Sequence, residues 1–240
     1  MRALILAAAL SLFELVSAQA PRRVLFIGNS LTYANSMPAM VEGIAHARGE
    51  AIHCETVAFS DYSLEDHWKQ GDAVRAIAHG GWSIVILQQG PSALPESRAL
   101  LREYVRRFDG EVRRVAARTA LYMVWPSADR RGDFDGVHQS YAAAAADVGG
   151  LLLPAGDAWR AAWRRDPKLM FYGSDGFHPA PLGSYLAALV IYQRLSGQSP
   201  VGMAATLMSP SDLFPSITHA QTQATVLQES AAEVNAALRE

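Results

Sequence analysis

The feature that most constrains the fold of this chain is an alternation between short, nearly continuous apolar runs and longer segments with helical spacing. The runs at 82–87 (WSIVIL) and 119–125 (TALYMVW) contain no charged residue, which is typical of strands buried on both faces of a parallel sheet. Related runs, some with mixed alternation, occupy 23–28, 51–59 and 150–154. Five strands joined by helical connections predict an α/β fold with a five-stranded parallel sheet.

The segments between these runs carry apolar residues three and four positions apart, which predicts helices that pack on the sheet. With helices on both faces, the chain should form a three-layer α/β/α sandwich. Reactive groups in such folds gather at the carboxyl ends of the strands, so the residues after each strand are the first candidates for chemistry. The expected helices span 38–48, 64–79, 95–118, 134–148, 182–195 and 218–238.

The first residues form a pattern typical of an export signal. Arg2 gives a short basic start, residues 3–13 form an apolar run, and residues 16–18 (VSA) fit the positions before a cleavage point. We expect a signal peptide over 1–18 and a single domain over 19–240, exported to the periplasm or secreted. The apolar run is too short to span a bilayer comfortably, and no other segment has the pattern of a transmembrane helix.

Charge and composition count against several functional classes. The 240-residue chain has a formal net charge of −2 and a pI near 6.4, so no basic excess favours nucleic acid as a partner. The single cysteine, Cys54, excludes an internal disulfide framework and a cysteine-rich zinc site, and it leaves an exported chain nothing to mispair. No dinucleotide, P-loop or His-Glu-x-x-His motif occurs, so we expect neither a cofactor nor a metal.

A glycine and a serine follow the first predicted strand, in the sequence Gly28-Asn29-Ser30-Leu31-Thr32. Glycine lets the chain turn sharply off the strand without a clash of a Cβ atom. Ser30 would then lie near a helix N-terminus above the sheet, where backbone N–H groups can stabilise an anion. The simpler alternative is a turn in which the serine caps the helix.

Asp175 and His178 lie three positions apart in a loop punctuated by glycine and proline, before the helix expected at 182–195. This short tether would let the carboxylate accept a hydrogen bond from Nδ1–H of the imidazole. Such a bond orients the ring and leaves Nε2 free to take a proton from a serine hydroxyl. The alternative is a turn in which Asp175 bonds nearby backbone.

Together, the two motifs resemble those of the SGNH hydrolase superfamily, also called the GDSL-type esterases and lipases. Residues 28–31 (GNSL) resemble the family's Gly-Asp-Ser-Leu block, and residues 175–179 (DGFHP) resemble its Asp-x-x-His-Pro block. The resemblance implies the SGNH/flavodoxin-like form of the sandwich and no cofactor. It also implies that Ser30 is the nucleophile, His178 the general base and acid, and Asp175 its orienting partner.

The two middle blocks depart from the family pattern. Where the family has a glycine whose N–H helps to bind the oxyanion, this chain has 60–64 (SDYSL), and where the family has a donor asparagine, the third strand ends in Gln88 and Gln89. The expected oxyanion donors are the N–H groups of Ser30 and Asp61 and the side-chain amide of Gln89. Gln88 is the alternative to Gln89, because the register is ambiguous by one residue. It also stays open that both glutamines only bond loop backbone.

Three other groups carry weaker signals. Asp135 and His138 have the spacing of the pair in the late loop, but they lie at the start of a predicted helix. His67 and Trp68 follow the second block and are candidates for lining a pocket. The segment 125–127 (WPS) ends a strand and is a candidate for shaping a substrate site. The simpler reading of each is ordinary packing or surface.

The predicted activity is that of an exported serine esterase. Ser30 would attack the carbonyl of a carboxylic ester, and water would later release the acyl group from the enzyme; deacetylation of a carbohydrate is one candidate reaction. The expected partner is a small-molecule or glycan ester, with no nucleic acid and no stable membrane span. Two alternatives stay open. One is a glycan- or protein-binding module of this fold with weakened catalysis, and the other is an esterase or thioesterase for lipid acyl chains.

Overall fold

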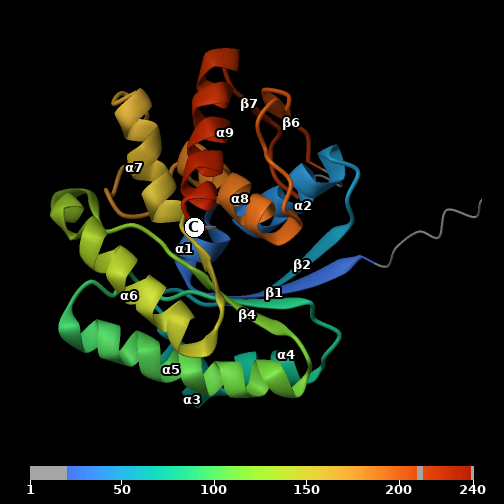
Figure 1. The fold of residues 1–240 in the computed structure, drawn as a ribbon, viewed down its shortest axis with the longest axis vertical. Coiled ribbons are helices and arrows are strands. Elements are labelled where there is room, and N and C mark those ends of the chain that lie inside the picture. The colour runs from blue at the N-terminus through green and yellow to red at the C-terminus, as the bar shows by residue number, and fades with distance from the viewer. Residues whose placement is uncertain (1–20, 210–212, 239–240) are drawn as a thin grey trace, which may run out of the picture.

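The computed structural model describes residues 21–209 and 213–238. Its centre is a five-stranded parallel sheet in the order β2-β1-β3-β4-β5, with helices on both faces (Figure 1). The predicted three-layer α/β/α sandwich is confirmed. The signal peptide predicted over 1–18 lies outside the described residues and stays a prediction. Among the helices that the structure describes, none is long and apolar enough to cross a membrane.

The strands form because each carries an apolar run that the two helical layers bury. In β3 every residue is buried, as a continuous apolar run predicts for a central strand. The chain passes from β1 to β2 on one side and then to β3 on the other side of β1. This reversal opens a crevice at the carboxyl ends of β1 and β3, where such sheets place their ligands. The strands are β1 (Arg22–Gly28), β2 (Ile52–Ala58), β3 (Ile84–Leu87), β4 (Arg118–Tyr122) and β5 (Leu151–Leu153).

Helices form the two outer layers (Figure 1). One layer packs α8 against α2, α7 and α9, and the other packs α5 against α3, α4 and α6. α8 is buried almost all round, because it lies between the sheet and its neighbouring helices. The first layer contains α2 (Met37–Ala47), α7 (Ala155–Arg165), α8 (Pro181–Ser196) and α9 (Gln221–Ala236). The second contains α3 (Leu64–Gln70), α4 (Asp72–Ala78), α5 (Pro95–Arg114) and α6 (Phe134–Val148).

Short elements follow two of the strands, and a short antiparallel pair lies beside the first helical layer. α1 (Ser30–Tyr33) and the 3-10 helix η1 (Ala34–Ser36) come directly after β1, and the 3-10 helix η2 (Ala128–Asp133) follows β4. β6 (Thr206–Leu207) and β7 (Ile217–Thr218) form an antiparallel pair near α2. The β6–β7 pair has no counterpart among the predicted elements.

Two predicted helices differ from the observed ones, for reasons of backbone conformation. The helix predicted over 64–79 is two helices, α3 and α4, because Gly71 adopts φ +81° and its left-handed conformation ends α3. The helix predicted to reach residue 118 ends at Arg114, because Ala116 has φ +56°. Residue 118 already pairs with Ile84 in the sheet.

Asp135 and His138 do not pair with each other, although they have the Asp-x-x-His spacing. Asp135 pairs with Arg160, and His138 Nδ1 lies 2.7 Å from Asp157 Oδ2. Both residues lie on one face of α6, so both meet partners on α7 and join the two helices. The hydrogen bond with Asp157 raises the pKa of His138 above its ordinary value of 6.5.

We expect His138 to contribute more stability in mild acid than in mild base. Because its pKa is raised in the folded state, the contribution is fully present below about pH 6.5 and is lost as the pH rises through the folded-state value. His138→Gln should therefore lower the melting temperature more at about pH 5.5 than at about pH 8.5. Thermal unfolding of both proteins measures this, and equal losses at the two pH values would contradict the pairing.

Candidate active site

Ser30 lies at the point where β1 gives way to α1, at the crevice between β1 and β3. Its neighbour Asn29 caps α1, because the Asn29 side-chain oxygen accepts a hydrogen bond from the N–H of Leu31 at 3.1 Å. The cap is therefore the asparagine and not the serine, which leaves the Ser30 hydroxyl for another partner.

That partner is the histidine of the late loop. His178 Nε2 lies 2.9 Å from Ser30 Oγ, and His178 Nδ1 lies 2.5 Å from Asp175 Oδ2. With Nδ1–H donating to the carboxylate, Nε2 accepts the serine proton, which is the arrangement of a serine-hydrolase triad. The structure thus brings together the three residues that the two motifs singled out, across 148 positions of sequence.

Asp175 is held in its charged form by its own loop. Its Oδ1 accepts hydrogen bonds from the N–H groups of Phe177 at 2.9 Å and His178 at 3.0 Å. The bond from the Phe177 N–H and the bond from the imidazole lower the pKa of Asp175 to about 2. The backbone turn considered as an alternative to the Asp175–His178 pair is therefore present, and the same carboxylate also accepts a hydrogen bond from the imidazole of His178. A charged carboxylate at this position can stabilise the imidazolium that forms during proton transfer.

Two hydrogen bonds from distant side chains hold the loop around His178. Trp125 Nε1 donates to the carbonyl of Phe177 at 3.1 Å, and Asn35 Nδ2 donates to the carbonyl of Pro179 at 2.9 Å. Asn35 belongs to η1, just after Ser30, so its bond ties the Ser30 segment to the loop that contains His178. The sequence analysis did not identify Asn35. Its φ of +55° is a left-handed conformation, which asparagine tolerates better than most residues.

Gln88 packs under the turn formed by residues 28–32, where its side chain is fully buried. Its Oε1 accepts hydrogen bonds from the N–H of Asn29 at 2.9 Å and from the hydroxyl of Thr32 at 2.7 Å. Its Nε2 donates to Asn29 Oδ1 at 3.0 Å and to the carbonyl of Gln89. A Cβ on Gly28 would lie 2.4 Å from Gln88 Oε1, so this close contact explains the glycine.

Gln89 lines the cavity in front of the serine, but its amide holds the loop that follows β3. Its Nε2 donates to Ser92 Oγ at 2.9 Å and to the carbonyl of Ser97 at 3.4 Å, and its Oε1 accepts from the N–H of Leu64 at 3.2 Å. The Tyr141 hydroxyl donates to the carbonyl of Gln89 at 2.6 Å. The predicted role of Gln89 as an oxyanion donor stays a prediction, and it requires one of the two Nε2 bonds to open.

Asp61 lies at the edge of the same cavity in a turn with φ +62°. This left-handed conformation is one that glycine adopts most readily and aspartate tolerates. The next residue, Tyr62, accepts a hydrogen bond at its carbonyl from Asn29 Nδ2 at 3.0 Å. The Asp61 turn is therefore fastened beside Ser30, in the block where the SGNH family pattern has a glycine and this chain has 60–64 (SDYSL).

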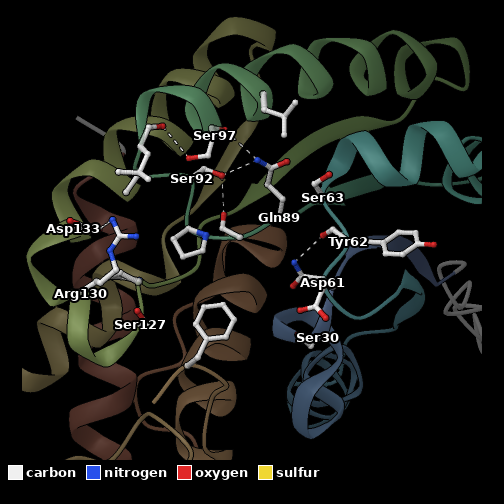
Figure 2. Close-up of a pocket in the computed structure, with 18 residues that line it drawn as sticks. Ser30, Asp61, Tyr62, Ser63, Gln89, Ser92, Ser97, Ser127, Arg130 and Asp133 are labelled. Carbon is white, nitrogen blue, oxygen red and sulfur yellow. Dashed lines mark hydrogen bonds and ion pairs between the residues drawn. The ribbon is translucent and has the colours of Figure 1, made fainter. Parts of the chain in front are cut away.

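A cavity of about 470 Å³ opens beside Ser30. Figure 2 shows Ser30 and Asp61 on one side of it, and Arg130 and Asp133 on the opposite side. Arg130 Nη2 pairs with Asp133 Oδ2 at 2.5 Å. Apolar side chains complete the lining: Pro91, Ala93, Leu94, Leu100, Pro126 and Phe177.

The remaining pocket candidates divide between the cavity and the core. Ser127 lines the cavity, in agreement with the role suggested for 125–127. His67 is fully buried beneath the turn formed by residues 28–32, and Trp68 packs edge-on against Phe108 with ring centres 5.3 Å apart. Both side chains face inward, because the side of α3 that carries them packs against the sheet and α5. Over residues 21–209 and 213–238, no three His, Cys, Asp or Glu side chains are grouped to hold a metal ion.

No protein-family model and no curated protein matches the sequence, but solved structures do. The chain is similar to a proposed SGNH hydrolase from Slackia heliotrinireducens, at 27% identity and a TM-score of 0.61, covering 73% of this chain and 100% of that one. It is also similar to a DUF4886 family protein from Bacteroides uniformis, at 17% identity and a TM-score of 0.74, covering 92% and 96%. An acetyl xylan esterase matches at 12% identity and a TM-score of 0.55, covering 73% and 98%.

These likenesses extend over most of the chain and concern its fold. The chain has the fold of the SGNH hydrolases. The resemblance first seen in residues 28–31 and 175–179 is confirmed at the level of the fold.

Gly28→Ala should destabilise the turn formed by residues 28–32. The added Cβ would lie 2.4 Å from both Gln88 Oε1 and Thr32 Oγ1, and neither atom can move away alone because the two are hydrogen-bonded to each other. We expect the free energy of unfolding to fall by about 1–3 kcal/mol, measured by urea denaturation. Gly110→Ala on α5 is the matched control, since its Cβ would meet nothing within 4 Å. Equal stability of the two variants would contradict the close contact.

Proposed function

We propose that this protein is an exported serine esterase that hydrolyses carboxylic esters through an acyl-enzyme. The observation that carries the proposal is the chain of two hydrogen bonds from Ser30 through His178 to Asp175, beside a cavity that suits a small ester. Similar solved structures include a lipase/acylhydrolase from Enterococcus faecalis and an esterase from Pseudoalteromonas. These neighbours support ester hydrolysis as the reaction class.

In the proposed reaction, Ser30 Oγ attacks the carbonyl carbon while His178 Nε2 takes the hydroxyl proton. The carbonyl oxygen becomes negative, and Asp175 stabilises the imidazolium. The carbon–oxygen bond to the alcohol then breaks, and the imidazolium gives its proton to the departing oxygen. A water molecule, deprotonated by the same histidine, attacks the acyl-serine. The bond between the acyl carbon and Oγ breaks, the imidazolium returns its proton to Oγ, and a carboxylic acid is released.

We propose the backbone N–H groups of Ser30 and Asp61 as the principal donors to the oxyanion. The first N–H groups of a helix have no partner within it, and Ser30 is the first residue of α1. Asp61 contributes through its backbone only, because a carboxylate opposes a negative charge. Gln89 joins these donors if substrate displaces its bond to Ser92. One such donor is typically worth about 3 kcal/mol in the transition state.

We further propose a carbohydrate ester, such as an acetyl ester, as the substrate. The cavity's charged residues are Asp61, Asp133 and Arg130, and Arg130 already pairs with Asp133, so an anionic substrate gains no net attraction. A guanidinium beside a carboxylate offers donors and acceptors together, which suits sugar hydroxyls. One similar structure is an acetyl xylan esterase. Export, predicted from residues 1–18, fits an extracellular glycan.

The first test compares hydrolysis of p-nitrophenyl acetate by the wild type, Ser30→Ala and His178→Ala. We expect turnover by the wild type and a loss of about 10³-fold or more in each variant, because the nucleophile or its base is removed. Circular dichroism establishes that all three proteins are folded. Equal, slow rates in three folded proteins would overturn the serine-esterase proposal and favour the glycan- or protein-binding module.

An acyl-chain series from acetyl to octanoyl separates the two remaining enzyme classes. An esterase for short acyl groups should have its highest kcat/KM at acetyl or propionyl. A kcat/KM that rises with each added methylene, as burial of a chain in an apolar site predicts, would support the lipid acyl esterase or thioesterase instead.

Arg130→Gln should weaken the preference for sugar esters. We expect the ratio of kcat/KM for an acetylated xylo-oligosaccharide to that for p-nitrophenyl acetate to fall about tenfold, because hydrogen bonds from a charged donor to sugar hydroxyls are lost. Arg131→Gln is the matched control: Arg131 lies 4.5 Å from the ring centre of Trp163 and 5.4 Å from that of Tyr172, outside the cavity lining. An unchanged ratio in Arg130→Gln would show that the alcohol does not contact this ion pair.

A further inference from the structure

We propose that His67, which belongs neither to the triad nor to the cavity wall, is a positioning residue for the nucleophile. Its imidazole holds the peptide unit between Gly28 and Asn29, immediately before Ser30. This inference rests on the proposed role of Ser30 as the nucleophile, and it adds a residue that acts on the serine from inside the core.

The hydrogen bonding of His67 is the first observation. The side chain is fully buried on α3, and its Nε2 lies 2.7 Å from the carbonyl oxygen of Gly28. A carbonyl oxygen only accepts, so Nε2 carries the proton and Nδ1 is left as an acceptor. Within the described part of the chain, Nδ1 has no hydrogen-bond partner. Buried polar atoms are nearly always paired, so a buried imidazole with one unpaired nitrogen calls for a reason beyond packing.

The position of the bond supplies that reason. The C=O of Gly28 and the N–H of Asn29 belong to one planar peptide group. Its C=O accepts from His67 and, at 3.3 Å, from the N–H of Phe59, while its N–H donates to Gln88 Oε1 at 2.9 Å. Because this planar peptide group is held at both its C=O and its N–H, it fixes the direction in which the chain enters the turn that contains Ser30.

Two aromatic rings keep the imidazole in place. Their centres lie 5.8 Å away for Phe59 and 5.1 Å away for Tyr62, which meets the imidazole edge-on. Burial lowers the pKa of His67, which favours the neutral ring that the geometry requires. Tyr62 also accepts the bond from the Asn29 side chain, so the same ring that shields His67 belongs to the segment fastened beside Ser30.

Loss of the His67 donor should therefore displace the Ser30 hydroxyl relative to His178 Nε2. Without it, the Gly28 carbonyl keeps only its longer bond to Phe59, and the peptide plane can tilt about the bond to Gln88. A displacement of about 1 Å of the nucleophile relative to its base costs on the order of 100-fold in rate. The cost should fall mainly on kcat, because His67 itself is not part of the cavity lining and the displaced atom is the reacting hydroxyl.

His67→Asn and His67→Gln test the proposal as a pair. Glutamine carries its Nε2 as many bonds from the backbone as the imidazole Nε2, whereas the amide of asparagine is one bond shorter and does not reach the Gly28 carbonyl. We expect His67→Asn to lower kcat for p-nitrophenyl acetate about 10- to 100-fold with KM changed less than about twofold, and His67→Gln to regain most of this loss. The rate of Ser30 labelling by a fluorophosphonate should follow the same order.

Lys69→Gln on the same helix is the control. Its ammonium is exposed and pairs with Glu65 at 2.7 Å, so this variant should keep the wild-type rates. Melting temperatures confirm that folded proteins are compared. Equal kcat and labelling rates in the two folded His67 variants would overturn the positioning role while leaving the serine-esterase proposal intact. A folded wild type that neither hydrolyses the ester nor accepts the label would overturn both.

Discussion

The contact between the Gln88 side chain and the backbone of Asn29 is the interaction on which the rest of the site depends. It joins the ends of β1 and β3 at the point where the strand order reverses. The contact requires a glycine at position 28. It also orients Asn29 so that the asparagine side chain caps α1, and the Ser30 hydroxyl has no capping role. The carbonyl of Tyr62, after β2, adds a third support. Three neighbouring strand ends thus fix one hydroxyl group.

The sheet and the triad geometry could be anticipated because their signals are local. Continuous apolar runs define the strands, and short motifs hold Ser30, Asp175 and His178. The glutamines could not be resolved in this way. Gln88 and Gln89 are adjacent and chemically identical, and their different roles depend on which face of β3's end each side chain takes. The structure directs Gln88 toward the turn formed by residues 28–32 and Gln89 toward the loop that follows β3.

Long-range contacts that follow no sequence periodicity could also not be predicted from the sequence. The bond from Asn35 to the carbonyl of Pro179 joins positions 144 apart, and no local sequence pattern predicts it.

The two Asp-x-x-His sequences show that spacing alone does not predict which side chains pair. In 175–178, Gly176 has φ +69° and the loop curls the carboxylate back to the ring. In 135–138 the same spacing lies on a helix, and each side chain finds its partner on α7. Spacing identifies candidates, and backbone conformation decides between them.

The order of the elements along the chain has a consequence for how the site comes into being. All five strands of the sheet are complete at Leu153, whereas Asp175 and His178 follow afterwards, just before α8. A chain that emerges from the ribosome N-terminus first can therefore build its sheet with the serine already set in its turn. The histidine that contacts this serine is made last. A partly made chain would carry the sheet and the hydroxyl group, and the hydrogen-bond partner of that hydroxyl would come only with the final third of the polypeptide.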